Sequence, residues 1–324
     1  MKMEAIKPVS GLNGRARPIV VFTRADQVKP SPTKWLIDRW LVSGTLAGLV
    51  GPSGAGKSFL AIDWACRVAT GTPWMGNAVR RGGVFYLAGE GQTGIRKRIA
   101  AWEGYHGVPV AGQPLYVADT LPFLTDDFQA AGTVAAIEAL EDELLFNCGG
   151  VDPALIVVDT VARAMGGANE NDAGDMGRLI GAMDWLRTRW GALVLAVHHT
   201  GHTDPGRARG SSAFKAALDS EFVVTADNPR VKLSVTKGKD WESPQPLVLE
   251  KHIVPVEILA ADGQPLRDSS LVLRADSEAA GIALKRADAY RLRKGGESIR
   301  EIARGLGVSK TTVGRWLGED ADAA

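Results

Sequence analysis

The chain has 324 residues, 45% of them hydrophobic, with 38 Lys and Arg against 37 Asp and Glu. This size and apolar content predict one large domain with room for a small second one. The balanced charge excludes a chain that is basic throughout, so a surface for nucleic acid or membrane must be local. No apolar run reaches the roughly 18 residues that cross a bilayer, and residues 1–17 lack the apolar core of a secretion signal.

The two cysteines, Cys66 and Cys148, each lie in a stretch with an amphipathic helical pattern. They fit buried thiols in a reducing compartment better than a disulfide. Together with the lack of a secretion signal, they predict a cytoplasmic protein without a membrane partner.

Residues 1–29 are predicted to form a flexible N-terminal segment, because they are rich in Gly, Pro and charged residues. Residues 35–42 are mainly apolar and contain two tryptophans. These tryptophans could belong to the core or form a shelf beside a ligand, and the sequence does not decide between the two.

A strand pattern at residues 45–50 leads into the sequence GPSGAGKS at 51–58, and a helix pattern follows. The spacing G-x-x-x-x-G-K-S in this context is typical of a phosphate-binding loop, whose glycines let successive N–H groups point at an anion. Lys57 is then expected to neutralise the β- and γ-phosphates of ATP, and Ser58 to hold Mg²⁺. The predicted nucleotide-binding residues are Gly51, Ser53, Gly54, Ala55, Gly56, Lys57, Ser58 and Phe59.

Two further apolar runs are each followed by a carboxylate. Residues 83–88 precede Glu90, and residues 154–158 precede Asp159. Both runs indicate buried parallel strands, whose carboxyl ends face the ligand in a doubly wound sheet. Glu90 is therefore a candidate general base, with a solvated loop glutamate as the alternative. Asp159 is a candidate Mg²⁺ ligand, with a helix cap as the alternative.

Another apolar run, residues 192–197, is followed directly by His198 and His199. No cysteine or carboxylate cluster with zinc spacing accompanies this pair, so the sequence disfavours a metal site. His199 is instead interpreted as a polar sensor beside the γ-phosphate. A glycine-flanked segment follows and carries Arg207 and Arg209.

The remaining pattern predicts an α/β fold over residues 30–276. Residues 92–104 are predicted to be a helix whose basic residues are solvated, and residues 129–146 a single long helix. The predicted sheet is doubly wound and mainly parallel, with antiparallel C-terminal strands. These last strands are expected at 221–225, 231–236, 247–254, 256–259 and 271–274.

Residues 277–324 are predicted to form a small all-α domain. Between 285 and 315, nine basic residues stand against three acidic ones. Ser298 and Glu301 form a capping box that opens a helix, and Gly307 begins a tight turn to a second helix. This is the layout of a helix-turn-helix that binds duplex DNA, although a helical hairpin packed on the main domain is the alternative. The residues expected to face DNA are Lys310, Thr311, Thr312 and Arg315.

Several segments together resemble a known family. In chain order they are GPSGAGKS, GVFYLAGEG, ALIVVDT, NENDAGDMG, VLAVHHTG and RGSSA. Over roughly residues 30–260 they resemble the RecA-like P-loop ATPases of the hexameric RepA replicative helicase family, found in plasmids and phages. The segment SIREIARGLGVSKTTVGRWL separately resembles the helix-turn-helix of DNA invertases and resolvases. The resemblance implies a homo-hexameric ring ATPase, with single-stranded DNA in the ring and nucleotide between subunits.

The resemblance also implies roles for single residues. Glu90 would polarise the attacking water, Asp159 would hold Mg²⁺ with Ser58, and His199 would sense the γ-phosphate. Arg209, or less favourably Arg207, would reach into the neighbouring subunit's nucleotide site as an arginine finger. A lysine of the TKGKD segment would reach into that site as well. The expected catalytic residues are thus Glu90, Asp159, His199, Arg209, Lys237 and Lys239.

Two departures from that family bear on strand unwinding, but not on ATP hydrolysis. The segment between His199 and Arg209 is short for a DNA-binding loop, and a helix-turn-helix is not an obligatory part of such helicases. The alternative is an ATP-controlled DNA-binding regulator, or a recombination-type ATPase without unwinding activity. A small-molecule kinase is disfavoured, because no segment has the pattern of a substrate lid.

Overall fold

The computed structural model describes most of the chain. The described residues are 24–89, 92–200, 212–259, 264–276, 285, 288–289, 292–293 and 295–317. The chain divides into two compact units, Met1–Lys34 and Trp35–Ala324. The described part of the first unit contains a short 3₁₀ helix, Ala25–Gln27. The domain boundaries expected after residues 29 and 276 stay predictions.

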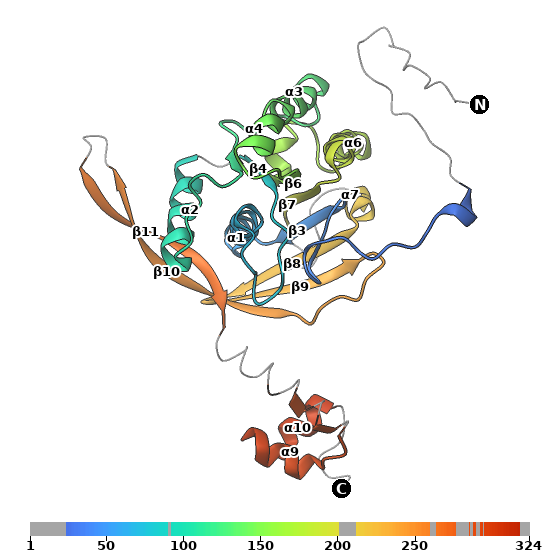
Figure 1. The fold of residues 1–324 in the computed structure, drawn as a ribbon, viewed down its shortest axis with the longest axis vertical. Helices are drawn as coiled ribbons and strands as arrows, with labels where there is room; N and C mark the ends of the chain where they lie inside the picture. Colours follow the sequence, from blue (N-terminus) through green and yellow to red (C-terminus); the bar gives the residue numbers. More distant parts are fainter. Residues whose placement is uncertain are drawn as a thin grey trace. The chain divides into compact units, whose positions relative to one another are not determined.

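The second unit is built on a nine-stranded sheet with the order β11-β10-β9-β8-β3-β7-β6-β4-β5 (Figure 1). Its strands are β3 (Leu46–Gly51), β4 (Gly83–Ala88), β5 (Leu115–Val117), β6 (Pro153–Asp159), β7 (Leu193–His199), β8 (Ser220–Asp227), β9 (Arg230–Gly238), β10 (Leu247–Leu259) and β11 (Pro265–Ala275). A separate two-stranded hairpin joins β1 (Trp35–Ile37) to β2 (Leu41–Val42).

The helices of this unit connect the strands or follow them. They are α1 (Lys57–Thr70), α2 (Gln92–His106), α3 (Asp127–Glu138), α4 (Glu141–Phe146), α5 (Val161–Ala164), α6 (Ala173–Trp190), α7 (Ser212–Ala217), α9 (Ile299–Leu306) and α10 (Lys310–Leu317). None of the helices that the structure describes is long and apolar enough to cross a membrane.

The strands from β8 to β5 pair in parallel, whereas β9, β10 and β11 continue the sheet in antiparallel pairs. The parallel part has the RecA-like order, with β3 between β8 and β7. After β3 the chain crosses to β4 and β5 at the edge, and the later crossovers return through β6 and β7 and pass β3 to reach β8. The structure confirms the predicted α/β fold, a mainly parallel sheet with antiparallel C-terminal strands.

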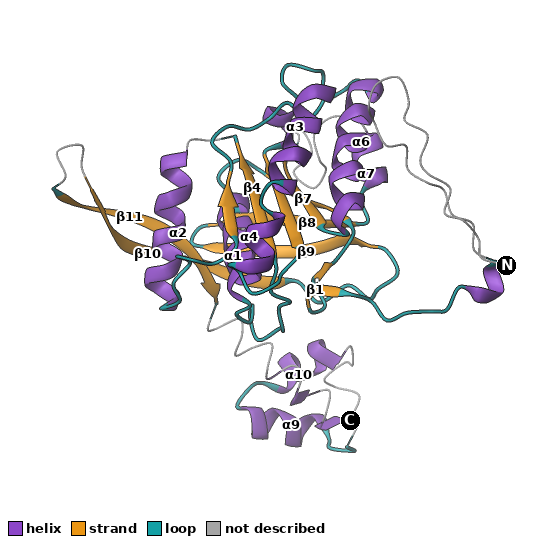
Figure 2. Cartoon of the chain, turned by 45° about the horizontal axis from the view of Figure 1, so that its top comes forward, coloured by secondary structure: helices purple, strands orange, loops and turns teal. Residues whose placement is uncertain are grey.

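Helices cover both faces of the parallel strands, which explains their continuous apolar sequences. The core on one face includes α1 and α2, and the core on the other includes α3, α6 and α7 (Figures 1 and 2). All seven residues of β6 are buried as a result. In β3, β4, β6 and β7 the carboxylate and imidazole side chains therefore lie at the strand ends, where function can use them.

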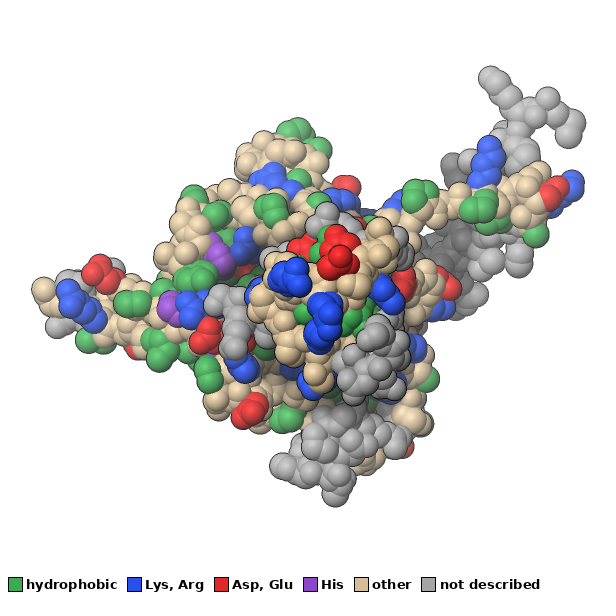
Figure 3. Space-filling model, turned by 90° about the horizontal axis from the view of Figure 1, so that it is seen from below, with side chains coloured by type: hydrophobic (Ala, Val, Ile, Leu, Met, Phe, Trp, Pro, Cys, Tyr) green, Lys and Arg blue, Asp and Glu red, His purple; other side chains and the backbone are tan. Residues whose placement is uncertain are grey.

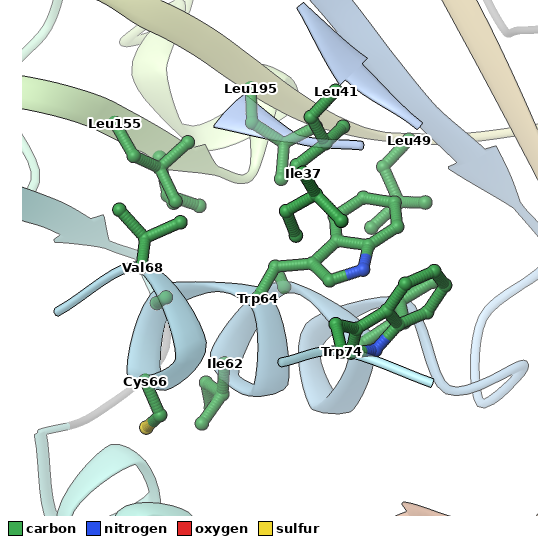
Figure 4. Close-up of a cluster of buried hydrophobic side chains, with 14 of the residues drawn as sticks. Ile37, Leu41, Leu49, Ile62, Trp64, Cys66, Val68, Trp74, Leu155 and Leu195 are labelled. Atoms are coloured by element: carbon green, nitrogen blue, oxygen red, sulfur yellow. The ribbon is translucent and has the colours of Figure 1, made fainter. Parts of the chain in front are cut away.

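Helix α1 is buried on two sides. Val68 points toward Leu155 and Trp64 toward Ile37 and Leu49, whereas Cys66 points the opposite way (Figure 4). Cys66 and Cys148 are both buried free thiols, as the sequence predicted. Burial raises the pKa of the Cys66 thiol well above its ordinary value, which keeps it protonated and unreactive.

A buried carboxylate joins α1 to α2. Asp63 accepts hydrogen bonds from the indole N–H groups of Trp74 and Trp102, each at 2.7 Å, and pairs with Arg67 at 3.3 Å. Burial raises its pKa, although Arg67 and the two indoles oppose the change. Burial and the Arg67 charge lower the pKa of the adjacent His106 to about 4, so that ring is neutral at pH 7. The network fixes α2 against α1.

The structure corrects two element predictions. Residues 129–146 are not one helix, because α3 ends at Glu138 and three acidic residues then open α4, a placement that suits a helix N-terminus. The segments 247–254 and 256–259 form the single strand β10. Pro255 is tolerated there because β9 pairs with β10 only up to Glu250, so its missing N–H breaks no bond to β9.

The C-terminal helices have a small core of their own. Ile302 of α9 and Val313 of α10 are fully buried in it. The predicted capping box of Ser298 and Glu301 is present, and Gly307 ends α9 in the left-handed region. In Figure 3, which faces these helices, Lys and Arg side chains lie on the visible surface among some acidic ones.

Replacing Trp102 by Phe should remove one donor from the buried Asp63 carboxylate. A lost hydrogen bond to a buried charged group costs about 1–3 kcal/mol, and we expect the free energy of unfolding in urea to fall by that amount. Trp185→Phe is the control, because Trp185 is 41% exposed and its replacement should change stability by less than about 0.5 kcal/mol. Equal stability of the two variants would show that the Asp63 network does not hold α1 and α2 together.

Candidate functional site

The carboxyl ends of β3, β6 and β7 meet at one edge of the sheet. Gly51 is paired in register with His199, and Asp159 with Val197. On the other side of β6, Asp159 is paired with Ala88. The in-register pairing therefore brings the start of the glycine loop, a carboxylate and an imidazole to the same edge.

The loop at residues 51–58 presents backbone amides at this edge. Gly54 and Gly56 have φ angles of 75° and 104°, which side chains other than glycine rarely adopt. Gly56 is the N-cap of α1 and has no side chain to cap the helix. The first N–H groups of α1 and its positive dipole end thus face the loop, an arrangement that favours an anion.

The Lys57 ammonium is held by backbone carbonyl groups at the start of the glycine loop. Its ammonium donates to the carbonyl oxygens of Gly51 and Pro52, each at 2.8 Å, and lies 3.2 Å from Nδ1 of His199. The side chain is 5% exposed. A cation is therefore fixed between the loop and the end of β7.

Asp159 is oriented by a buried tyrosine. The Tyr86 hydroxyl donates to Oδ2 of Asp159 at 2.6 Å. Burial, followed by the Asp159 charge, raises the pKa of Tyr86 well above its ordinary value, so the hydroxyl remains a donor. The backbone N–H of Gly89 donates to the carbonyl of Asp159 at 2.6 Å. The chain leading to Glu90 thus passes beside Asp159, although Glu90 lies outside the described residues.

A cavity of about 230 Å³ opens over the loop. Its lining includes His199 and Thr160, the residue after Asp159, together with Arg98 of α2. The loop and the first turn of α1 contribute Ser53, Gly54, Gly56, Lys57, Ser58 and Phe59. The basic residues of α2 were predicted to be solvated, so Arg98 was missed as a site residue. The usable signal was its spacing, because Arg98 lies one helical turn before the apolar Trp102.

The other predicted residues lie elsewhere or are not described. Arg207 and Arg209 lie outside the described residues. The Lys237 ammonium donates to the carbonyls of Lys215 and Ala216, at 2.9 and 3.1 Å. The Lys239 ammonium lies 3.7 Å from Oδ1 of Asp219. A role for Lys237 or Lys239 in a neighbouring site stays a prediction. Within the described part of the chain, no cluster of His, Cys, Asp and Glu could hold a metal by itself.

Comparison with known proteins gives a family. The model of the AAA domain family matches residues 14–205, more than half of the 324 residues. The chain belongs to this AAA domain family. Among solved structures, it is similar to the KaiC-like protein PH0186 from the hyperthermophilic archaeon Pyrococcus horikoshii OT3. That similarity has a TM-score of 0.47 and 14% identity, and covers 74% of this chain and 93% of PH0186.

Membership of the AAA domain family agrees with the geometry of the site. The matched residues include the glycine loop, Asp159 and His199. Their placement at the edge of a RecA-like sheet is that of a P-loop ATPase domain. The P-loop ATPase part of the expected resemblance is therefore confirmed, whereas RepA-type helicase activity and DNA binding stay predictions.

Lys57→Ala should weaken nucleotide binding. The ammonium is expected to make charge-assisted hydrogen bonds to phosphate, and the loss of one costs about 1.5–3 kcal/mol, or at least about tenfold in Kd for ATP measured by calorimetry. Lys232→Ala is the matched control, because Lys232 is an exposed lysine of β9. Unchanged affinity in Lys57→Ala would remove this loop from nucleotide binding.

Proposed function

We propose that this protein is a Mg²⁺-dependent ATPase that assembles into a ring and acts on DNA, as a RepA-like replicative helicase of a plasmid or phage. The observation that carries the proposal is the meeting of Lys57, Asp159 and His199 at the carboxyl edge of the sheet. Phosphoryl transfer to water needs positioning and charge neutralisation rather than covalent help, and these residues supply both.

The residues fit a magnesium ion bound with the nucleotide. Mg²⁺ prefers hard oxygen ligands, and its protein ligands are usually few because substrate phosphates supply the others. Ser58 lines the cavity, and Tyr86 holds the Asp159 carboxylate through Oδ2. Ser58 and Asp159 would hold the ion, which would neutralise charge on the β- and γ-phosphates.

His199 suits the role of γ-phosphate sensor. Its Nδ1 lies 3.2 Å from the Lys57 ammonium, the group expected to contact the β- and γ-phosphates. Loss of the γ-phosphate would therefore alter the contacts of His199 at the end of β7. The segment that carries Arg209 follows this strand in the sequence. This continuity supports the assignment of that segment as a link between subunits in a homo-oligomer, which we propose to be a hexamer with single-stranded DNA inside.

The C-terminal helices support a separate contact with duplex DNA. Lys310, Thr311 and Arg315 are exposed on α10, and Thr312 is half-buried. The Ser309 hydroxyl accepts from the Thr312 N–H at 3.0 Å, which caps the start of α10, the helix proposed to enter the major groove. The same exposed cations also favour the second candidate function, a DNA-anchored regulator whose assembly is controlled by ATP.

Subunit mixing tests the ring ATPase. Glu90→Gln should still bind ATP but lower kcat by about 10²–10⁴, because it removes the proposed general base. Arg209→Ala should also be inactive if this arginine acts in the neighbouring subunit. Mixed rings of the two variants should regain part of the activity, through interfaces that carry both intact groups. No recovery at any ratio, in rings of confirmed size, would contradict a role for Arg209 between subunits.

Deletion after Asp276 tests the proposed DNA contact. The truncated chain should keep its ATPase rate within about twofold and lose salt-sensitive binding to duplex DNA. In the full chain, Arg315→Ala should lower the slope of log Kd against log salt by about one, because one phosphate contact is lost. An unchanged affinity and slope after deletion would assign the helices a packing role. Stimulation of the ATPase rate by single-stranded DNA favours the replicative helicase. Dependence of the ATPase rate on one duplex sequence favours the DNA-anchored regulator.

A further inference from the structure

Arg98 is a second basic residue at the cavity over the glycine loop. Its guanidinium carbon lies 4.7 Å from the centre of the Phe59 ring, and both residues line the cavity with Lys57, Ser58 and His199. Phe59 directly follows Ser58, so the ring brings the guanidinium to the first turn of α1. Arg98 comes from a different segment of the chain, helix α2.

The face of α2 that carries Arg98 is fixed toward α1. Ile95 and Trp102, which lie three residues before and four after Arg98, are both 2% exposed and share this face. The Trp102 indole donates to Asp63 of α1 at 2.7 Å. The position of Arg98 is therefore set by a buried network one helical turn away.

The neighbouring basic residues of α2 point elsewhere. Arg96 is exposed, and Lys97 pairs with Asp268 of β11 at 2.7 Å. Among the residues that the structure describes, no ion pair joins Arg98 to a carboxylate. Only one of the three consecutive basic residues is thus directed to the cavity.

The charge of Arg98 acts on the rest of the site. It is one of the influences that lower the pKa of Tyr86, against the larger effects of burial and Asp159. The charge of Arg98 therefore acts at the Tyr86 hydroxyl, the group that donates to Asp159. The Arg98 guanidinium carbon lies over the Phe59 ring, which leaves N–H donors at the edge of the group, and such donors match phosphate oxygens in a bidentate geometry.

We propose that Arg98 binds the phosphates of the nucleotide, in the same subunit as Lys57, with Phe59 holding its guanidinium plane. The inference deepens the proposed ATPase function and rests on it. Contact with phosphate is favoured over stacking on the base, because the cavity is lined mainly by loop residues, Thr160 and His199 rather than by apolar side chains. Mg-ATP carries a net negative charge, and one lysine would leave part of it uncompensated.

The test compares three variants of the full chain by calorimetric titration with Mg-ATP and with inorganic tripolyphosphate, which has no base. Arg98→Gln should weaken binding of both ligands by about tenfold, the effect of one lost charge-assisted hydrogen bond. Arg98→Lys should fall between Arg98→Gln and wild type, because lysine keeps the charge but loses the bidentate fork. Arg96→Gln is the matched control and should stay within about twofold of wild type.

The outcomes separate the two proposals. If wild type binds neither ligand, the proposed ATPase function fails, and this inference fails with it. If wild type binds both and Arg98→Gln binds them equally well, only the role of Arg98 is overturned. A loss for Mg-ATP without a loss for tripolyphosphate would also overturn it, by placing Arg98 at the base. If Arg98→Gln does not fold, Arg98→Lys decides by the same comparison, since unchanged tripolyphosphate affinity would refute the phosphate contact.

Discussion

The in-register parallel pairing of β3 with β7, and of β7 with β6, is the constraint on which the site depends. It places Gly51 beside His199 and keeps Asp159 on the adjacent strand at the same edge. A slip of one residue in any of these pairs would turn the terminal side chain to the other face of the sheet. The buried apolar runs that hold this register therefore also position the polar groups at their ends.

A second constraint fixes the helices that frame the loop. Asp63 is one turn and a half into α1, which begins at Lys57, and its two indole partners tie α1 to the Trp74 segment and to α2. On its other side α2 packs on the β10–β11 hairpin through Ala101 and the Lys97–Asp268 pair. This buried polar network thus sets the position of Arg98 at the cavity, although Arg98 is far from the glycine loop in sequence.

Local sequence was sufficient for the parts of the site that a single segment determines. The glycine loop, the run ending in Asp159 and the run ending in His199 each combine a buried strand with one polar end, and parallel pairing does the rest. Arg98 could not be assigned in this way. Helical spacing places Arg98 on the same face as Trp102, but it does not show what that face contacts. The direction of this face depends on Trp102 reaching Asp63 across a chain separation of 39 residues.

The misjudged elements have a similar cause. Pro255 suggested the end of a strand, but it lies where β10 has left β9 and is paired with β11 alone. Residues 129–146 were predicted to form one helix, whereas the acidic residues after Glu138 begin a second one. In both places the neighbouring element decides the outcome. Glu90 and Arg209 lie outside the described residues, so their roles stay predictions.

The proposed ATPase function depends on a triphosphate binding at the amides between Gly51 and Ser58, above Lys57. The most direct measurement is the change in backbone amide NMR shifts when a non-hydrolysable ATP analogue and Mg²⁺ are added to the labelled protein. We expect large downfield shifts of the Gly54, Gly56 and Lys57 amides, because their N–H groups would donate to phosphate. Saturating ligand that shifts amides elsewhere, and leaves these unchanged, would contradict it.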